Sequence, residues 1–268
     1  MPVQQDQNHQ PAGAEVQRHL LRKLLTEKIS FGQQFNEAQL AREFNVTRQA
    51  IREALCQAVG WGVIEYVPYR GFQIRDFTMR EIVDWYKLRL AIEPLAAREI
   101  AERRPQATLK ALSTQCQLER RAFAVGDFDG IGEANREFHR TIVSGCGNSQ
   151  YAKSAILAGF AVCFNFDREL RTTLGYLRFH GGEIVSEEEQ KKYLYIQCTG
   201  TVHQDADTLK ILASGTPAQA EKRVRWYMDR VLAQTLITFE SYGDPDTPLS
   251  QMVKNYRRYF RKSARPGN

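Results

Sequence analysis

The chain has 268 residues, of which 43% are hydrophobic and 25% charged, and it carries a formal net charge of +6. No apolar run approaches the roughly 18 residues that a membrane-spanning helix needs, so we expect a cytoplasmic protein without a membrane span. The five cysteines contain no C-x-x-C pair, which argues against a disulfide framework, a zinc ribbon and a thioredoxin motif.

A polar tail and an amphipathic helix are expected at the start of the chain. Residues 1–14 contain no apolar stretch and are predicted to be a disordered tail and not a signal peptide. Residues 15–30 repeat aliphatic side chains at helical spacing against arginines and lysines. We therefore expect a first helix that ends near Gly32.

Two short helices on either side of a tight turn are predicted next, at residues 37–44 and 47–59. Thr47 stands where its hydroxyl would cap the free N–H groups of the second helix. The spacing gives that helix an apolar face of Ile51, Ala54, Leu55 and Ala58, and a polar face of Arg48, Gln49, Arg52 and Glu53. A helix with two arginines one turn apart and a packed back face is suited to the major groove of DNA.

A hairpin pattern completes this first domain. Residues 63–67 and 72–76 have the composition of strands, and they flank a turn that runs from Pro68 to Gly71. Three helices and a two-stranded hairpin predict a winged helix-turn-helix at residues 15–77.

The rest of the chain is predicted to be helical, because no strand pattern recurs after Thr78. Pro94 is expected to kink the first long helix. Helices are predicted at residues 79–103, 106–125, 127–144, 149–173, 186–214 and 217–240. The fold class is therefore mostly α, with an all-helical bundle of six to seven helices at 78–240 and a basic C-terminal tail at 241–268. The length of the segment 171–200 has no explanation in the sequence.

Three sequence runs resemble one family. They are V-T-R-Q-A-I-R-E-A-L at 46–55, R-G-F at 70–72 and R-L-A-I-E at 89–93. The order of elements around them is similar to that of the GntR transcriptional regulators, and the bundle resembles the FCD effector domain of the FadR-like subfamily. This resemblance covers about residues 15–240. It implies a homodimeric, ligand-responsive regulator that binds double-stranded operator DNA and most simply acts as a repressor.

The resemblance also implies which residues contact DNA. In the helix at 47–59 it points to Thr47, Arg48 and Arg52, and Gln49 shares their polar face. At the wing it points to Arg70 and Gly71, near the minor groove. Some family members have an arginine where this chain has Ala38, so the operator of a relative is not expected to transfer to this chain.

Polar residues interrupt the apolar stripes of four bundle helices. A buried polar group costs about 1–3 kcal/mol when it is unpaired, so several on separate helices predict a shared polar site for an effector. Arg89 has two possible roles: to hold the carboxylate of a ligand, or to pair with Glu93 four residues later. A small organic acid is the expected ligand, with the metal-free acyl-CoA-sensing branch of the family as the alternative. The candidate residues are Arg89, Asn135, His139, Asp205 and Tyr227.

The resemblance raises the question of a metal. In many FCD domains one aspartate and three histidines hold a divalent ion, and the corresponding positions here are Asn135, His139, Asp205 and Tyr227. Only His139 matches, so we expect a degenerate site with His139 and Asp205 as candidate ligands for zinc or a similar ion. A hydrogen-bonded core histidine is the competing role for His139.

Other function classes find less support in the sequence. No P-loop, G-x-S-x-G or H-E-x-x-H motif occurs, and we predict that the chain is not an enzyme. A constitutive architectural DNA binder is the alternative of a different class. Such a protein would not need a large bundle with polar inward positions.

Overall fold

The computed structural model describes residues 13–26, 30–169, 187–240 and 244–251. Contacts between residues divide the chain into two units, Met1–Arg75 and Asp76–Asn268. The sequence pattern placed this boundary two residues later, between 77 and 78. Most of the predicted tail at 1–14 lies outside the described residues, as do parts of the segment 171–200 and of the tail 241–268.

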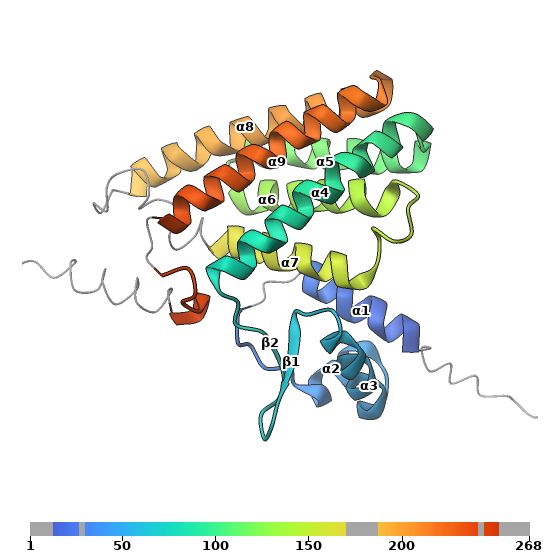
Figure 1. The fold of residues 1–268 in the computed structure, drawn as a ribbon, viewed down its shortest axis with the longest axis vertical. Coiled ribbons are helices and arrows are strands. Elements are labelled where there is room, and N and C mark those ends of the chain that lie inside the picture. The colour runs from blue at the N-terminus through green and yellow to red at the C-terminus, as the bar shows by residue number, and fades with distance from the viewer. Residues whose placement is uncertain (1–12, 27–29, 170–186, 241–243, 252–268) are drawn as a thin grey trace, which may run out of the picture. The chain divides into compact units, whose positions relative to one another are not determined.

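Three helices build the first unit: α1 (Gly13–Thr26), α2 (Glu37–Phe44) and α3 (Arg48–Val59) (Figure 1). Helix α3 packs against both α1 and α2. Helix α1 begins at Gly13, two residues before the first helix that the sequence pattern predicts. Val16 and Leu20 are buried in the core, which holds the first helical turn in place.

The turn between α2 and α3 is fixed by local chemistry. The Asn36 side chain caps α2 by accepting a hydrogen bond from the Gln39 N–H, at 2.9 Å. Asn45 ends α2 in the left-handed conformation, at φ 53°, which asparagine tolerates better than most residues. The Thr47 hydroxyl then accepts a bond from the Ala50 N–H at 3.2 Å, so its predicted role as N-cap is confirmed.

The wing is an antiparallel hairpin of β1 (Ile64–Val67) and β2 (Gly71–Ile74), paired Ile64 with Ile74 and Val67 with Gly71. A third segment, which the sequence pattern did not reveal, pairs with β2. The Phe35 N–H donates to the Phe72 carbonyl and the Ile74 N–H donates to the Gln33 carbonyl, both at 2.9 Å. This segment immediately precedes α2, so its bonds fasten the helix-turn-helix to the wing.

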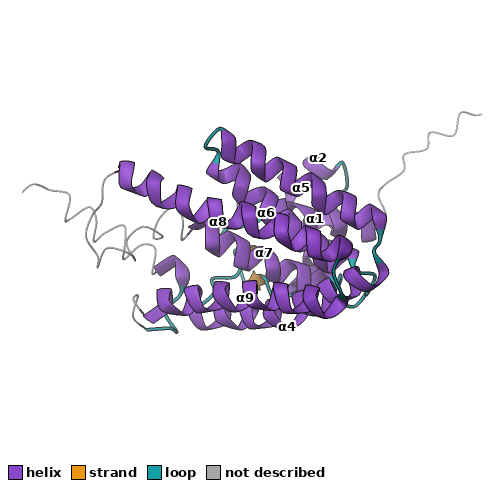
Figure 2. Ribbon diagram, turned by 90° about the horizontal axis from the view of Figure 1, so that it is seen from above, coloured by secondary structure: helices purple, strands orange, loops and turns teal. Residues whose placement is uncertain are grey.

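The second unit is a helical bundle. Its first helix begins with a capping box between Thr78 and Glu81 and continues through Pro94 to Arg103. Figure 2 shows the helix α9 (Pro217–Glu240) lying beside this helix, and the contacts between the two are extensive. No helix in the described parts of the chain is long and apolar enough to cross a membrane. The helices are α4 (Met79–Arg103), α5 (Gln106–Ala124), α6 (Phe128–Gly145), α7 (Ser154–Glu169), α8 (Glu187–Ser214) and α9 (Pro217–Glu240).

Helix α7 begins later than the predicted start at 149. The Asn148 side chain accepts a hydrogen bond from the Gln150 N–H at 3.0 Å, and this local bond holds a turn where a helix was expected. Gly159 then lets α7 approach α4, since a Cβ at that position would overlap the Trp85 ring. The close approach brings α7 against the middle of the bundle.

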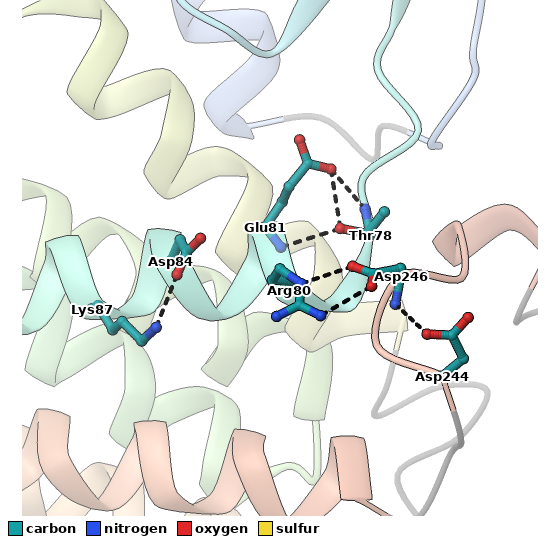
Figure 3. Close-up of polar contacts among 7 residues, drawn as sticks. All are labelled: Thr78, Arg80, Glu81, Asp84, Lys87, Asp244 and Asp246. Carbon is teal, nitrogen blue, oxygen red and sulfur yellow. Dashed lines mark hydrogen bonds and ion pairs between the residues drawn. The ribbon is translucent and has the colours of Figure 1, made fainter.

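A segment that follows α9 returns to the start of α4, which corrects the picture of 241–268 as only a basic tail. The Leu249 N–H donates to the Phe77 carbonyl at 2.8 Å, and the Arg80 N–H donates to the Pro245 carbonyl at 3.1 Å. Figure 3 shows Arg80 in a bidentate pair with Asp246, next to the capping box of α4. Residues 244–251 thus fasten the stretch that links the two units to the bundle.

Replacing Leu249 by alanine tests what holds this segment. The side chain is only 1% exposed, so Leu249→Ala should lower the free energy of unfolding by about 2–3 kcal/mol. Arg80→Ala is the control and should have little effect, because both side chains of its ion pair are about 60% exposed. Urea denaturation of both variants measures the difference. Equal losses would show that surface charge, and not apolar burial, anchors the segment.

Candidate functional site

The polar face of α3 is exposed to solvent. Arg48 makes no side-chain hydrogen bond or ion pair with any residue in the described part of the chain. Arg52 lies 3.4 Å from the Glu37 carboxylate, but its side chain is half exposed, so the pair is weak and can exchange for another anion. Gln49 donates to Glu53 at 2.8 Å. The face thus presents two guanidinium groups that are able to bind phosphate or guanine.

The start of α2 carries a carboxylate and no cation. Glu37 occupies its first turn, where a negative charge is favoured by the helix dipole, and Ala38 follows. Because Glu37 lies close to Arg52, it partly neutralises one of the two arginines of α3. The start of α2 therefore adds no positive charge to the exposed arginines of α3 and the wing.

The wing tip exposes Arg70 and the neighbouring tyrosine. The Arg70 side chain has no partner among the described residues, and its backbone N–H closes the turn by donating to the Val67 carbonyl at 3.0 Å. Gly71 has φ 81°, a conformation that glycine adopts without strain. The sequence reasoning singled out Arg70 and Gly71 and passed over Tyr69, which is fully exposed between them and Pro68.

A buried ion pair lies at the centre of the bundle. Arg89 Nε donates to Glu93 Oε1 at 2.6 Å, and both side chains are buried. The second oxygen of Glu93 lies 2.6 Å from His139 Nδ1 on α6. Of the two roles open for Arg89, the structure shows the pair with Glu93. The guanidinium also lies over the rings of Tyr86 and Phe160, 5.4 Å from each centroid.

These partners hold both groups of the pair in their charged forms. Burial alone would raise the pKa of Glu93, but Arg89 and His139 outweigh that effect and lower it. Burial would likewise lower the pKa of Arg89, but the charge and hydrogen bond of Glu93, together with Cys163 and Tyr86, raise it on balance. With Glu93 ionised, His139 donates its Nδ1 proton to the carboxylate.

His139 therefore presents its other ring nitrogen, Nε2. This atom is buried and has no hydrogen-bond partner among the described residues. Its ring stacks on Tyr227 from α9, with centroids 5.0 Å apart and an angle of 17° between the planes. A histidine oriented by a carboxylate at one nitrogen and free at the other is arranged to bind a ligand.

A second polar cluster joins α5, α6 and α8. The Asn135 amide donates to Asp205 Oδ2 at 3.0 Å, and Asp205 is buried. The fully buried Glu119 lies near this carboxylate, although neither of its oxygens makes a hydrogen bond of good geometry with the described residues. Burial, and then the charge of Asp205, raise the pKa of Glu119 to about 10, so this side chain is a neutral acid at physiological pH. Burial also raises the pKa of Asp205.

The structure thus places the five predicted effector residues in two neighbouring clusters. Sequence reasoning missed Glu119, although it lies seven residues after the buried Leu112 and three after Cys116, on their apolar stripe of α5. It also missed Met228, whose sulfur lies 3.9 Å from Arg89 Nη2. His203 is exposed, so it does not take the place of Asp205.

These residues fit a divalent metal poorly. His139 Nε2 is oriented as a metal ligand would be, but Asp205 is bonded to Asn135, and Tyr227 stacks on the histidine ring. Among the described residues, no group of three or more His, Cys, Asp or Glu side chains is placed to hold a metal ion. A metal at His139 and Asp205 stays a prediction.

Two family models match this chain. Residues 12–74 match the model described as "Bacterial regulatory proteins, gntR family", and residues 84–158 match the FCD domain. The first range corresponds to the helix-turn-helix and wing, and the second runs from α4 into α7.

Two named transcriptional regulators are similar to parts of this chain. An uncharacterized HTH-type transcriptional regulator, YdhC of Bacillus subtilis, is 31% identical over 113 residues, which are 42% of this chain and 50% of YdhC. The HTH-type transcriptional repressor RspR of Escherichia coli is 27% identical over 133 residues, 50% of this chain and 58% of RspR. The similarity therefore spans only about half of each relative's length.

Two solved structures share the fold. A putative transcriptional regulator GntR from Rhodococcus sp. RHA1 superposes with a TM-score of 0.57 at 20% identity, over 84% of this chain and 97% of that one. E. coli McbR/YncC superposes with a TM-score of 0.61 at 17% identity, over 86% and 98%. At these identities the likeness concerns the fold alone.

The buried Glu119 gives a pH prediction. An unfolded glutamate titrates near about pH 4.3, so between that value and about 10 the folded state binds the extra proton. The stability contributed by this group is complete below the lower value and is lost as the pH rises toward the upper one. Glu119→Gln removes that dependence. Its free energy of unfolding relative to wild type should therefore increase between about pH 5 and about pH 8, as measured by urea denaturation. A difference that is constant with pH would contradict the protonated Glu119.

Proposed function

Since this chain belongs to the GntR family of bacterial transcriptional regulators and carries an FCD domain, we propose that it binds operator DNA and releases or retains it in response to a small metabolite. The family consists of regulators and not of enzymes. The reading residues would be Arg48 and Arg52 in the major groove, Gln49 beside them, Thr47 at the helix start, and Arg70 with Gly71 at the wing.

The exposed polar face of α3 is the observation that supports DNA binding most. Its back face is buried, its N-cap is formed, and Arg48 has no side-chain partner among the described residues. A single unpaired guanidinium on a solvated helix would be unremarkable elsewhere. On the second helix of a helix-turn-helix it stands where base edges are contacted.

The proposed effector is a small organic acid that carries hydroxyl groups. His139 Nε2 would hydrogen-bond to its carboxyl group, and Glu93 would hold the ring in place through Nδ1. Asn135 and Asp205 would bind the hydroxyls. Of the two roles open for Arg89, the direct anchor is not the one proposed here: it would act through Glu93, because its charge is already paired.

Effector binding would be coupled to DNA binding through α4 and α9, the helices that carry residues of the His139 cluster. Arg89 and Glu93 lie on α4, which starts directly after the linker, and Tyr227 lies on α9, whose continuation at 244–251 is bonded to that linker. In a homodimer, small shifts of these helices would change how two copies of α3 meet half-sites one DNA turn apart, about 34–36 Å.

Arg48→Ala should weaken binding to a duplex selected with the wild-type chain from a random-sequence library. A base contact by arginine contributes about 1–3 kcal/mol of discrimination, so a loss of roughly 5- to 150-fold is expected. Fluorescence anisotropy of the labelled duplex measures it. Arg121→Ala, an exposed arginine of α5 with the same change of charge, is the matched control. Wild-type affinity in Arg48→Ala would place the reading face elsewhere.

His139→Leu should abolish the response to the acid without changing the affinity for DNA. An acid that binds the wild-type chain is expected to change operator affinity in the same anisotropy assay, and the variant should lose this response while it keeps the affinity measured without acid. The physical reason is that leucine fills the space of the ring but has no nitrogen to offer. A variant that responds like the wild type would exclude the His139 cluster as the sensor.

A further inference from the structure

The wing tip contains a tyrosine in an unusual position. Tyr69 has φ 64°, in the left-handed region, and its side chain is 107% exposed. The turn runs from Val67 to Arg70 and is closed by the Arg70 N–H donating to the Val67 carbonyl. Proline in the second place and a positive φ in the third are the features of a type II turn, where glycine or asparagine is favoured.

This conformation destabilises the wing. A side chain with a Cβ is strained in the left-handed region, and a bulky one is rarely found there. The strain is not offset by packing, since no described residue makes a hydrogen bond, ion pair or ring contact with the Tyr69 side chain. Full exposure of an aromatic ring also leaves its apolar surface in water. A residue that destabilises the fold through both its backbone conformation and its exposed ring is a candidate for a binding role.

The surroundings of Tyr69 indicate what it contacts. Arg70 follows it with an unpaired guanidinium, and both stand at the end of the hairpin that the GntR model covers. Tyr66, on β1, is half exposed and is held by an edge-to-face contact with Phe72 at 5.2 Å. The tip therefore presents the phenol of Tyr69 and the guanidinium of Arg70 next to each other, and the Tyr66–Phe72 contact packs the strands that carry them. Hydroxyls and guanidinium groups are common donors to the phosphates of DNA.

We propose that Tyr69 is a DNA-backbone contact of the wing, with its hydroxyl donating to a phosphate oxygen and its ring lying against the adjacent deoxyribose. This inference rests on the proposed DNA-binding function and extends it to a residue outside the family-derived set. The full exposure of the ring at the turn leaves it accessible to DNA beside Arg70.

A neutral contact has a distinct signature in salt. Binding by arginine or lysine releases counterions, so losing one such contact reduces the salt dependence of the affinity by about one ion. Losing a tyrosine contact weakens binding without that change. Strain has a second signature, because glycine at position 69 removes the penalty of the positive φ.

The test uses three variants: Tyr69→Gly, Tyr69→Phe and Arg70→Gln. For each one, fluorescence anisotropy measures the affinity for the library-selected duplex at several salt concentrations, and urea denaturation measures the stability. Tyr69→Gly should unfold at a higher urea concentration than wild type, yet bind the duplex about tenfold more weakly with an unchanged salt slope. Tyr69→Phe keeps the backbone restraint and should lose about two- to fivefold, the share of the hydroxyl. Arg70→Gln should lower the salt slope by about one.

Wild-type affinity in both Tyr69→Gly and Tyr69→Phe would overturn the proposal. So would wild-type affinity in Tyr69→Phe together with a weakened Tyr69→Gly, because a looser turn alone would then explain the loss. In either case Arg48→Ala, measured beside them, shows whether DNA binding through α3 still holds. If Arg48→Ala also bound normally, the proposed function itself would fail.

Discussion

The bundle is organised around one buried ion pair, Arg89 with Glu93, and its extension to His139. Removing one partner of such a pair costs about 3–5 kcal/mol, because the other charge is left buried and alone. Two helices must therefore keep their register, since α4 supplies the pair and α6 supplies the histidine. The same constraint explains the shape of the candidate sensor. Glu93 uses both oxygens on its neighbours, and the described contacts of His139 leave its Nε2 for a ligand.

The two units use charge in opposite ways. On α3 the arginines are exposed and weakly paired, which suits a surface that exchanges its counterions for phosphates. Inside the bundle the charges are desolvated and tightly partnered, and Glu119 avoids a second buried negative charge beside Asp205 by keeping its proton. The segment 244–251 is hydrogen-bonded to Phe77, just before α4, and to Arg80 in the first turn of that helix.

Local features of this structure were predictable from the sequence. Thr47 as a cap, the apolar face of α3 and the hairpin strands each depend on residues close together in the chain. Long-range pairings were not predictable. Nothing in the order of residues signals that Gln33 pairs with Ile74, that Leu249 returns to Phe77, or that Glu119 faces Asp205. For Arg89 the sequence allowed either a ligand carboxylate or Glu93 as the partner. The structure shows the pair with Glu93, at 2.6 Å between Nε and Oε1.

We infer that the His139 cluster is a receptor and not merely a satisfied core. It is tested most directly by native mass spectrometry of the full chain mixed with a panel of small mono- and dicarboxylic acids, some of them hydroxylated. We expect one acid bound per chain, with hydroxylated acids retained at higher collision energy than their deoxy analogues. Bare protein masses across the whole panel, at concentrations that saturate known acid-binding proteins, would contradict it.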